Sequence, residues 1–323
     1  MYGDFFMRKN EITMKRNTGN SIERCFDAYV KKCEIDNLSK YTISASKTAY
    51  RVFSFYVDTN MPMDSIKEDT IDGFILFLKH RESCNDNSIN SYLRMIRVWL
   101  YWAMEKGYMD KFKINLIRTS ETIKETYTKD ELDKLLKKPD IRNCTFTEYK
   151  TWVFTNFLLG TGMRISSALS VKIEDVDFGG MMIIMNRSKN RRAQTIPMSK
   201  TLSQVLKEYL DFRQGEPDDF LFCNVTGGPG NVKSFQDNLS YYNNSRGVSK
   251  KSAHLYRHTF AKNWILNGGD IFRLKAILGH SSLDMVNQYV KMFSNDVAVD
   301  FDKFNPLDNL VKNDKFIKMK KND

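Results

Sequence analysis

Apolar side chains recur at intervals of three and four residues from Ser21 to about Asp110, and this spacing constrains the fold more than any other feature of the chain. Ile22, Cys25 and Phe26 begin a one-sided apolar stripe of the kind that an amphipathic helix buries. The same pattern predicts helices over residues 21–36, 42–57, 67–79 and 88–106. Because their connections are short and polar, and no stretch of this region alternates like a strand, we expect a compact helical bundle.

The helical pattern is lost after this region, in a stretch that is rich in charge and threonine. We interpret residues 113–127 as an extended linker, which leaves residues 21–112 as a first domain and residues 1–20 as an N-terminal extension. Thr128 and Glu131 then match a capping box, in which each side chain binds the backbone N–H of the other residue. This pair predicts the start of a helix.

The second domain, residues 128–295, is predicted to be mainly helical with one small sheet. Helices are expected near residues 129–138, 147–160, 199–213, 231–244, 254–267 and 281–293. Residues 181–185 and 193–197 are predicted strands, and the polar, basic connection between them indicates an antiparallel pair. The chain is therefore predicted to be mainly α, with a helical bundle, an α+β domain and a charged tail at residues 296–323.

The charge balance narrows the choice of partner. The 323 residues include 50 lysines and arginines against 39 aspartates and glutamates, a formal net charge of +11, which favours a polyanion or an anionic membrane surface. No apolar run approaches the roughly 18 residues of a membrane-spanning helix, and the N-terminus does not resemble a signal peptide. The five cysteines match no metal-ligand spacing, so we expect reduced thiols in a cytoplasmic protein. Nucleic acid is the leading partner.

Two basic patterns of the second domain can bind phosphate. Arg164 follows a Gly-Thr-Gly break at residues 160–162, where its guanidinium can meet a phosphate beside backbone N–H groups. The same pattern also fits a surface arginine in an ordinary turn between helices. The predicted hairpin tip can enter a DNA groove, although most charged tips are simply solvated. Its basic residues are Arg187, Lys189, Arg191 and Arg192.

Two further patterns contain histidine and tyrosine. His254 and Arg257 lie three residues apart, so on a helix they share a face and can bind two oxygens of one phosphate. Gly279 ends a helix before His280, and Tyr289 lies about two turns into the helix that follows. A tyrosine at such a position usually packs with its hydroxyl at the surface. As a nucleophile it needs cationic neighbours, because a phenol is protonated near neutral pH.

In this order, the four patterns resemble the tyrosine recombinase (phage integrase) family. The resemblance rests on Thr-Gly-Met-Arg-Ile-Ser around Arg164, Lys-Asn-Arg-Arg-Ala-Gln-Thr-Ile-Pro from Lys189, His-Leu-Tyr-Arg-His-Thr-Phe-Ala from His254, and Leu-Gly-His-Ser-Ser with a tyrosine nine residues after the histidine. It covers residues 128–294, and residues 87–97 also match a DNA-facing helix of the family. The resemblance implies a helical core-binding domain and a catalytic domain of the tyrosine recombinase type.

The same resemblance implies a site-specific DNA recombinase that needs neither a metal ion nor a cofactor. Tyr289 would attack the scissile phosphate and form a 3′-phosphotyrosyl intermediate. Arg164 and Arg257 would bind the pentavalent phosphorane. His254 and His280 would donate further hydrogen bonds, and His254 would help to deprotonate the tyrosine.

Lys189 and Ser167 are the two positions at which the comparison with the family pattern is least direct. Lys189 is the candidate general acid for the leaving 5′-oxygen, and it is chosen by counting back from Pro197 along the family pattern. Family members often carry an acidic residue where this chain has Ser167. That difference puts the local packing around Arg164 in question.

The resemblance also implies how the chain meets double-stranded DNA at a recombination site. The two domains would close around the duplex as a clamp. Further expected contacts to phosphates or grooves are Lys47, Arg51, Arg94 and Arg97. The alternative for any one of them is that it only makes a helix face soluble. The tail after the tyrosine packs on a neighbouring protomer in this family, which implies a homo-oligomer, a tetramer in the synaptic complex. Folding back onto its own domain is the alternative.

Several biological roles stay open at this point. The favoured role is integration or excision of a mobile element or prophage in a bacterial cytoplasm, on the nucleoid when bound to DNA. Chromosome-dimer resolution is the alternative, and an accessory directionality factor is a further candidate partner. A protein that only binds DNA would usually have lost one of the six catalytic residues, which are all present here. A topoisomerase of the same chemistry fits the two-domain layout less well.

Overall fold

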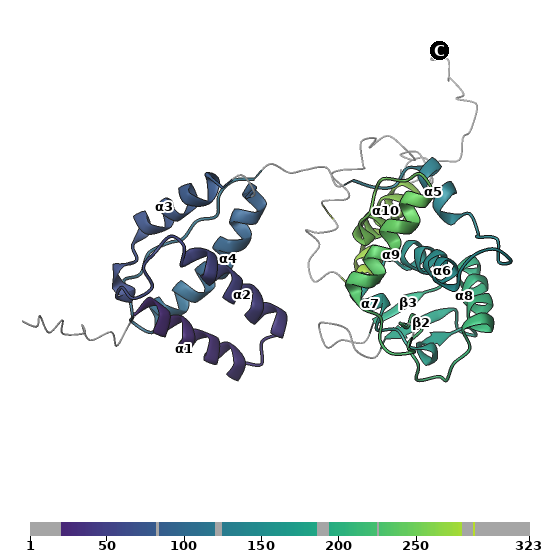
Figure 1. The fold of residues 1–323 in the computed structure, drawn as a ribbon, viewed down its shortest axis with the longest axis horizontal. Helices are drawn as coiled ribbons and strands as arrows, with labels where there is room; N and C mark the ends of the chain where they lie inside the picture. Colours follow the sequence, from purple (N-terminus) through teal and green to yellow (C-terminus); the bar gives the residue numbers. More distant parts are fainter. Residues whose placement is uncertain are drawn as a thin grey trace, which may run out of the picture. The chain divides into compact units, whose positions relative to one another are not determined.

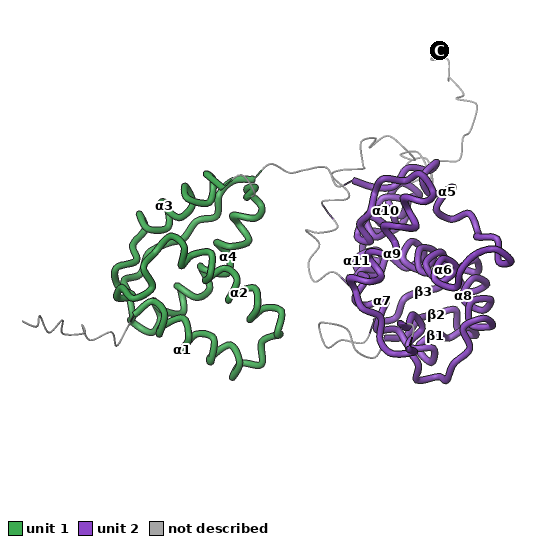
Figure 2. The backbone as a smooth tube through the Cα atoms, in the orientation of Figure 1, with its two compact units in different colours: residues 1–122 green, residues 123–323 purple. Residues whose placement is uncertain are grey.

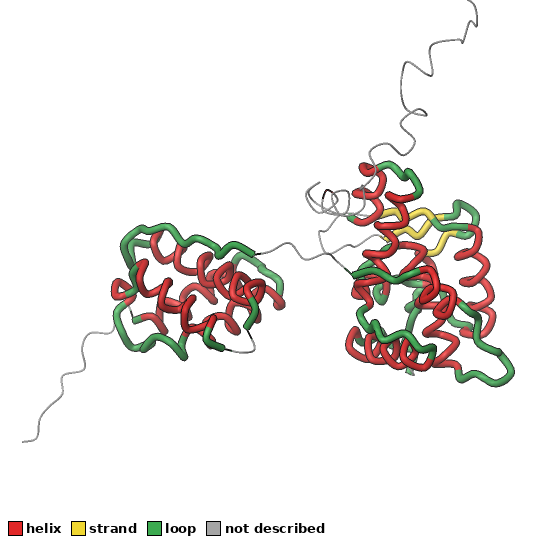
Figure 3. The backbone as a smooth tube through the Cα atoms, turned by 90° about the horizontal axis from the view of Figure 1, so that it is seen from above, coloured by secondary structure: helices red, strands yellow, loops and turns green. Residues whose placement is uncertain are grey.

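The computed structural model of the chain is drawn in Figure 1, and it describes residues 21–81, 84–119, 125–185, 194–224, 226–279 and 287. They belong to two compact units, residues 1–122 and residues 123–323, which Figure 2 colours separately. Each unit has a buried core of its own. The predicted fold class is confirmed, because both units are mainly helical and the second holds a small antiparallel sheet (Figure 3).

The first unit is a bundle of α-helices. Its elements are α1 (Ile22–Ile35), α2 (Lys40–Phe53), the 3₁₀ turn η1 (Met63–Ser65), α3 (Glu68–Lys79) and α4 (Asp86–Glu105). The side chains of Ser21, Ser39 and Asn85 begin α1, α2 and α4, because each accepts a hydrogen bond from a backbone N–H of the first turn. These caps satisfy N–H groups that have no partner inside the helix.

Trp99 of α4 lies at the centre of the first core and is fully buried. The rings of Phe26, Tyr50 and Phe53 meet it edge-on, with ring centroids 5.3, 5.7 and 6.1 Å away. Phe26 and Tyr50 also stack on each other at 3.9 Å. Aromatic pairs contribute about 0.5–1.5 kcal/mol each beyond the area that they bury. They therefore help to hold α1 and α2 against α4.

One predicted helix boundary is wrong. The apolar pattern extends the second helix to Val57, but α2 ends at Phe53 and the chain then turns. The N–H of Val57 still donates to the carbonyl of Phe53 at 3.1 Å, and its side chain packs on the core from the turn. Val57 therefore follows the apolar spacing of the helix because its side chain is packed against the core, although its backbone is not helical.

Asn90 of α4 fastens the chain that follows the bundle. This buried side chain donates to the carbonyl of Ile117 at 2.9 Å and accepts from the N–H of the same residue at 3.0 Å. Ile114 is buried in the same core, and Leu116 packs against it. The first part of residues 113–127, the predicted linker, is thus packed onto the bundle.

The Asn90→Ala variant is expected to lower the free energy of unfolding of the first unit by roughly 2 kcal/mol, because both backbone groups of Ile117 lose their partner. Urea denaturation measures this loss, and limited proteolysis should cut residues 110–119 sooner. Ser91→Ala is the matched control, since Ser91 is an exposed residue of the same helix. An Asn90→Ala protein as stable as the wild type would contradict the expectation.

The second unit is built around α6 (Phe146–Thr161). The helices that pack against it are α5 (Lys129–Leu136), α8 (Lys200–Arg213), α9 (Val232–Ser245) and α10 (Ala253–Leu266). The other elements are α7 (Ile165–Ala168), η2 (Ile173–Asp175), β1 (Val176–Asp177), β2 (Met182–Met185), β3 (Gln194–Pro197) and α11 (Ile271–Leu278). The strand order is β1-β2-β3, and Met185 pairs with Gln194 where β2 ends and β3 begins.

Local signals predicted most of this unit. The capping box is confirmed, since the N–H of Thr128 donates to Glu131 at 2.8 Å and that of Glu131 donates to Thr128 at 3.3 Å. The strand pair is confirmed as well. The sequence pattern missed β1, which has only two residues and so shows no periodicity, and it gave no range for α11 although Gly279 was expected to end a helix. The helix predicted at residues 281–293 lies outside the described residues, apart from Asn287.

Candidate active site

Arg164 occupies the N-terminal cap of α7, directly after α6 ends. Gly162 ends α6 with a φ of 63°, in the left-handed region that favours glycine. A Cβ at this position would lie 2.6 Å from Cδ1 of Phe260 and 2.8 Å from Cδ2 of Leu278. The glycine therefore allows both the turn and the close approach of α10 and α11. It leaves Arg164 exposed at the beginning of the next helix.

Arg257 of α10 is only 2% exposed. Its Nη1 donates to the carbonyl of Gly162 and its Nη2 to the carbonyl of Leu278, both at 2.8 Å. These carbonyls lie at the C-terminal ends of α6 and α11, where backbone acceptors have no helical partner and the helix dipole is negative. One buried cation thus joins the segment that leads into Arg164 to the segment that leads into His280.

His254 lies in the first turn of α10, one turn before Arg257. The ring of His254 meets that of His258 nearly perpendicularly, with centroids 4.5 Å apart. His254 is exposed, whereas His258 and Arg257 are buried. The predicted His-x-x-Arg pair is therefore a histidine at the surface and an arginine beneath it.

A buried polar network ties α10 to the beginning of the unit. Asn243 of α9 accepts from the hydroxyl of Tyr256 at 3.0 Å and donates to that of Tyr127 at 2.9 Å. The N–H of Tyr127 donates to Thr259 at 2.9 Å. Both tyrosines are buried, which raises the pKa of each hydroxyl above its ordinary value and keeps both hydroxyls out of reach of DNA. Sequence reasoning missed Asn243, since nothing local marks a partner 116 residues away.

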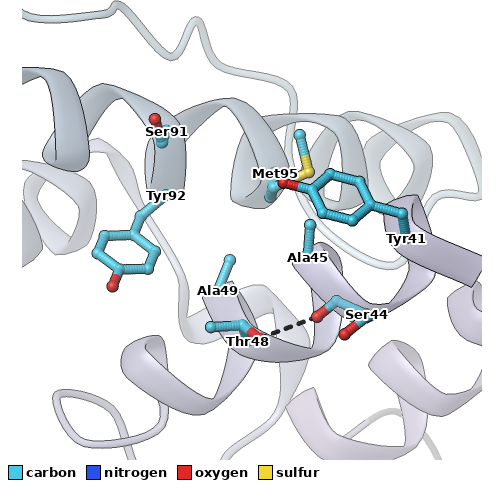
Figure 4. A pocket seen from close by; sticks show the side chains of 8 residues that line it. All are labelled: Tyr41, Ser44, Ala45, Thr48, Ala49, Ser91, Tyr92 and Met95. Atoms are coloured by element: carbon cyan, nitrogen blue, oxygen red, sulfur yellow. Dashed lines mark hydrogen bonds between the residues drawn. The ribbon is translucent and has the colours of Figure 1, made fainter. Parts of the chain in front are cut away.

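The first unit offers a second surface of interest, a groove of about 290 Å³ between α2 and α4 (Figure 4). It is lined by Tyr41, Ser44, Ala45, Thr48, Ala49, Ser91, Tyr92 and Met95. α2 carries three basic residues and no acidic residue. Of the cations predicted to contact DNA, Lys47, Arg51 and Arg94 are exposed and Arg97 is half-buried.

The other predicted site residues lie outside the described part of the chain; they are Arg187, Lys189, Arg191, Arg192, His280 and Tyr289. Their roles stay predictions. Within the described ranges, no group of three or more His, Cys, Asp and Glu side chains is placed to hold a metal ion. None of the helices in those ranges combines the length and the apolar character that a membrane-spanning segment needs.

Comparison with known families decides what kind of protein this arrangement belongs to. The family model described as "Phage integrase family" matches residues 125–295, which is more than half of the chain. The chain belongs to the phage integrase family. A second model, "Phage integrase SAM-like domain", matches residues 21–123, the part that contains the helical bundle. The predicted family is thereby confirmed, and the chain is a tyrosine recombinase, an enzyme that transfers DNA strands.

Individual tyrosine recombinases align over most of the chain. The tyrosine recombinase XerD of Listeria innocua is 24% identical over 282 residues, which cover 83% of this chain and 94% of the relative. The Tn1549 transposon integrase, solved with a circular intermediate DNA, has a TM-score of 0.69 at 21% identity and covers 84% of this chain and 95% of its own. A lambda integrase dimer bound to a COC′ core site has a TM-score of 0.69 at 14% identity, over 85% of this chain and 97% of its own. Both structures share the fold.

Proposed function

We propose that this tyrosine recombinase cleaves and rejoins double-stranded DNA at a specific site, with Tyr289 as the nucleophile. The proposal is supported mainly by the position of Arg257, whose guanidinium donates to the carbonyl of Gly162 at the end of α6 and to the carbonyl of Leu278 at the end of α11. The segments leading into Arg164 and His280 thus meet at one buried cation. Groups from three separate parts of the sequence can then converge on one phosphate.

In the proposed reaction the phenolic oxygen of Tyr289 attacks the scissile phosphorus. A 3′-phosphotyrosyl bond forms and the bond to the 5′-oxygen breaks. His254 accepts the phenolic proton, and Lys189 gives a proton to the departing 5′-oxygen. Arg164 and Arg257 stabilise the negative charge that builds up on the equatorial oxygens of the phosphorane. A free 5′-hydroxyl reverses these steps, so rejoining needs no external source of energy.

The proposed biological role is integration or excision of a mobile element, in a tetramer on paired sites. The fold shared with the Tn1549 transposon integrase supports this role. Chromosome-dimer resolution is the second candidate, because the similarity to XerD extends over 94% of that relative. The position of the recombination site separates the two roles. It lies at the ends of a mobile element in the first case and at one chromosomal locus in the second.

We also propose that the groove between α2 and α4 faces the DNA. Methyl groups of Ala45 and Thr48 suit contact with thymine methyls, and the hydroxyls of Ser44 and Ser91 suit hydrogen bonds with base edges. The exposed cations beside the groove would contact phosphates, which position the protein on the duplex without reading its sequence. The absence of acidic residues from α2 fits a polyanionic partner.

The variants Lys47→Ala and Arg94→Ala are each expected to weaken binding to the recombination site by about 3–10-fold and to reduce the salt slope of binding by about 1. Cleavage at saturating DNA should stay at the wild-type rate, since neither residue touches the scissile phosphate. Binding titrations over a range of salt concentrations measure both quantities. Lys31→Ala, on the exposed face of α1, is the control. An unchanged salt slope for Lys47→Ala and Arg94→Ala would place the DNA on another face.

Covalent capture tests the proposed function. Nicked duplexes with a randomised segment release a short strand after cleavage, which prevents rejoining and traps the protein on the DNA. Adducts that survive detergent are selected and sequenced. We expect adducts that share a recurrent sequence, which also supplies the site for every later assay. If the wild-type protein forms no adduct, the proposed cleavage through a phosphotyrosyl bond to Tyr289 is refuted.

A further inference from the structure

The C-terminal end of α11 is held by side chains from two other elements. The last carbonyls of a helix have no partner within the helix. Here the carbonyl of Ile277 accepts from Nε2 of Gln194 at 2.7 Å, and the carbonyl of Leu278 accepts from Nη2 of Arg257 at 2.8 Å. Gln194 is the first residue of β3 and lies 83 residues from Ile277 in the sequence. This bond therefore ties the sheet to α11.

Gly279 allows the amide of Gln194 to lie against the end of α11. The glycine ends this helix with a φ of 62°, again in the left-handed region. A Cβ on Gly279 would lie 3.1 Å from Nε2, 3.2 Å from Oε1 and 3.3 Å from Cδ of Gln194. The whole amide thus packs closely over the glycine. This contact confines the amide while its N–H donates to Ile277.

The end of α11 in turn orients Arg257. A guanidinium is planar, and its N–H groups point in fixed directions. Nη1 of Arg257 is bound to Gly162 and Nη2 to Leu278, which belong to different segments. If the end of α11 moved, the guanidinium would have to turn or lose one of these bonds. The carbonyls of Ile277 and Leu278 are neighbours in one eight-residue helix, so a tether on the first restrains the second.

We propose that Gln194 is a positioning residue for Arg257. Gln194 holds the carbonyl of Ile277, keeps the carbonyl of Leu278 in place, and so directs the guanidinium of Arg257. The inference rests on the proposed function, in which Arg257 binds the scissile phosphate. Gln194 acts through Arg257 rather than on the DNA. Sequence reasoning placed Gln194 only in a strand, because its partner is set by tertiary packing.

The test compares two scissile groups, an ordinary phosphodiester and a methylphosphonate. The methylphosphonate lacks one charged oxygen, so its cleavage depends less on the positive charge of Arg257. A variant that acts through Arg257 should therefore lower the cleavage rate of the methylphosphonate by a smaller factor than that of the phosphodiester. Gln194→Met keeps the side-chain length and removes the donor. We expect it to lower single-turnover cleavage of the phosphodiester by about 10–100-fold. On the methylphosphonate its rate should come within about threefold of the wild type.

Two further variants sharpen the comparison. Gln194→Glu places a carboxylate oxygen opposite the carbonyl of Ile277. It should therefore lower the rate of phosphodiester cleavage by at least as large a factor as Gln194→Met. Tyr242→Phe is the matched control, because it removes another buried side-chain bond of this unit, to the carbonyl of Leu135 at 2.8 Å. It should cleave both substrates at the wild-type rate.

The outcomes separate this inference from the proposed function. The positioning role would be overturned if Gln194→Met cleaved the phosphodiester at the wild-type rate, or if its cleavage rate fell by the same factor on both substrates. Either result would show that the bond from Gln194 to Ile277 serves only the fold. A wild-type protein that forms no adduct on either substrate would refute the proposed function, and this inference with it. Recovery of the variant on the methylphosphonate supports both.

Discussion

The Tyr289→Phe variant is expected to form no covalent adduct with DNA, a loss on the order of 10⁴-fold or more in single-turnover cleavage. The substitution removes the phenolic oxygen that attacks the phosphorus, and the 3′-phosphotyrosyl bond cannot form without it. Binding to the nicked duplex should stay within about twofold of the wild type, because affinity for DNA comes mainly from phosphate contacts. Denaturing gels measure the adduct, and fluorescence anisotropy measures the affinity.

Tyr241→Phe is the matched control for this prediction. Tyr241 of α9 is 79% exposed, so the substitution removes the same atom from a surface position, and the adduct should form at the wild-type rate. Tyr127 and Tyr256 are not rival nucleophiles, because both are buried in the core of the second unit and both hydroxyls are bonded to Asn243. An adduct that persists in the Tyr289→Phe variant would move the nucleophile to another residue.

The sequence predicted the features that depend on neighbours in the chain. Periodicity placed α1 and α4 within two residues of their ends, because their apolar stripes face one core. Thr128 and Glu131 satisfy each other's N–H groups across three residues, so the pair was recognisable before any packing was known. Gly279 ends α11 as expected, since the left-handed residue after a helix is commonly glycine.

Features that depend on contacts between distant segments could not be predicted. The spacing of His254 and Arg257 indicates a shared helix face, but it does not say that the arginine is buried. That burial arises because α10 packs on α6 and α11, which places two carbonyl acceptors around the guanidinium. Gln194 is a similar case, because a polar residue at the start of a short strand carries no local signal of its partner in α11.

The variants Arg164→Ala and Arg257→Ala are each expected to lower single-turnover cleavage by about 10²–10³-fold, since each removes a donor to the phosphorane. Both variants should bind DNA with nearly the wild-type affinity, unlike the Lys47→Ala and Arg94→Ala variants. The two variants should differ in their free energy of unfolding. Arg164 is exposed, so its loss should change the free energy of unfolding by less than about 0.5 kcal/mol. Loss of Arg257 leaves two carbonyls without this partner and should cost about 2 kcal/mol or more.

Arg257→Lys separates the charge of Arg257 from its geometry. An ammonium keeps the positive charge but lacks the planar fork, so it cannot reproduce both carbonyl bonds together with a bidentate contact to phosphate. We expect part of the lost stability to return and cleavage to stay at least about tenfold below the wild type. Urea denaturation and the nicked substrate measure the two effects. If Arg257→Lys cleaved at the wild-type rate, the site would need only a cation there, and the tethers from α6 and α11 would serve the fold alone. If Arg164→Ala cleaved normally, the division between cations that bind DNA and cations that act on the phosphorane would be wrong.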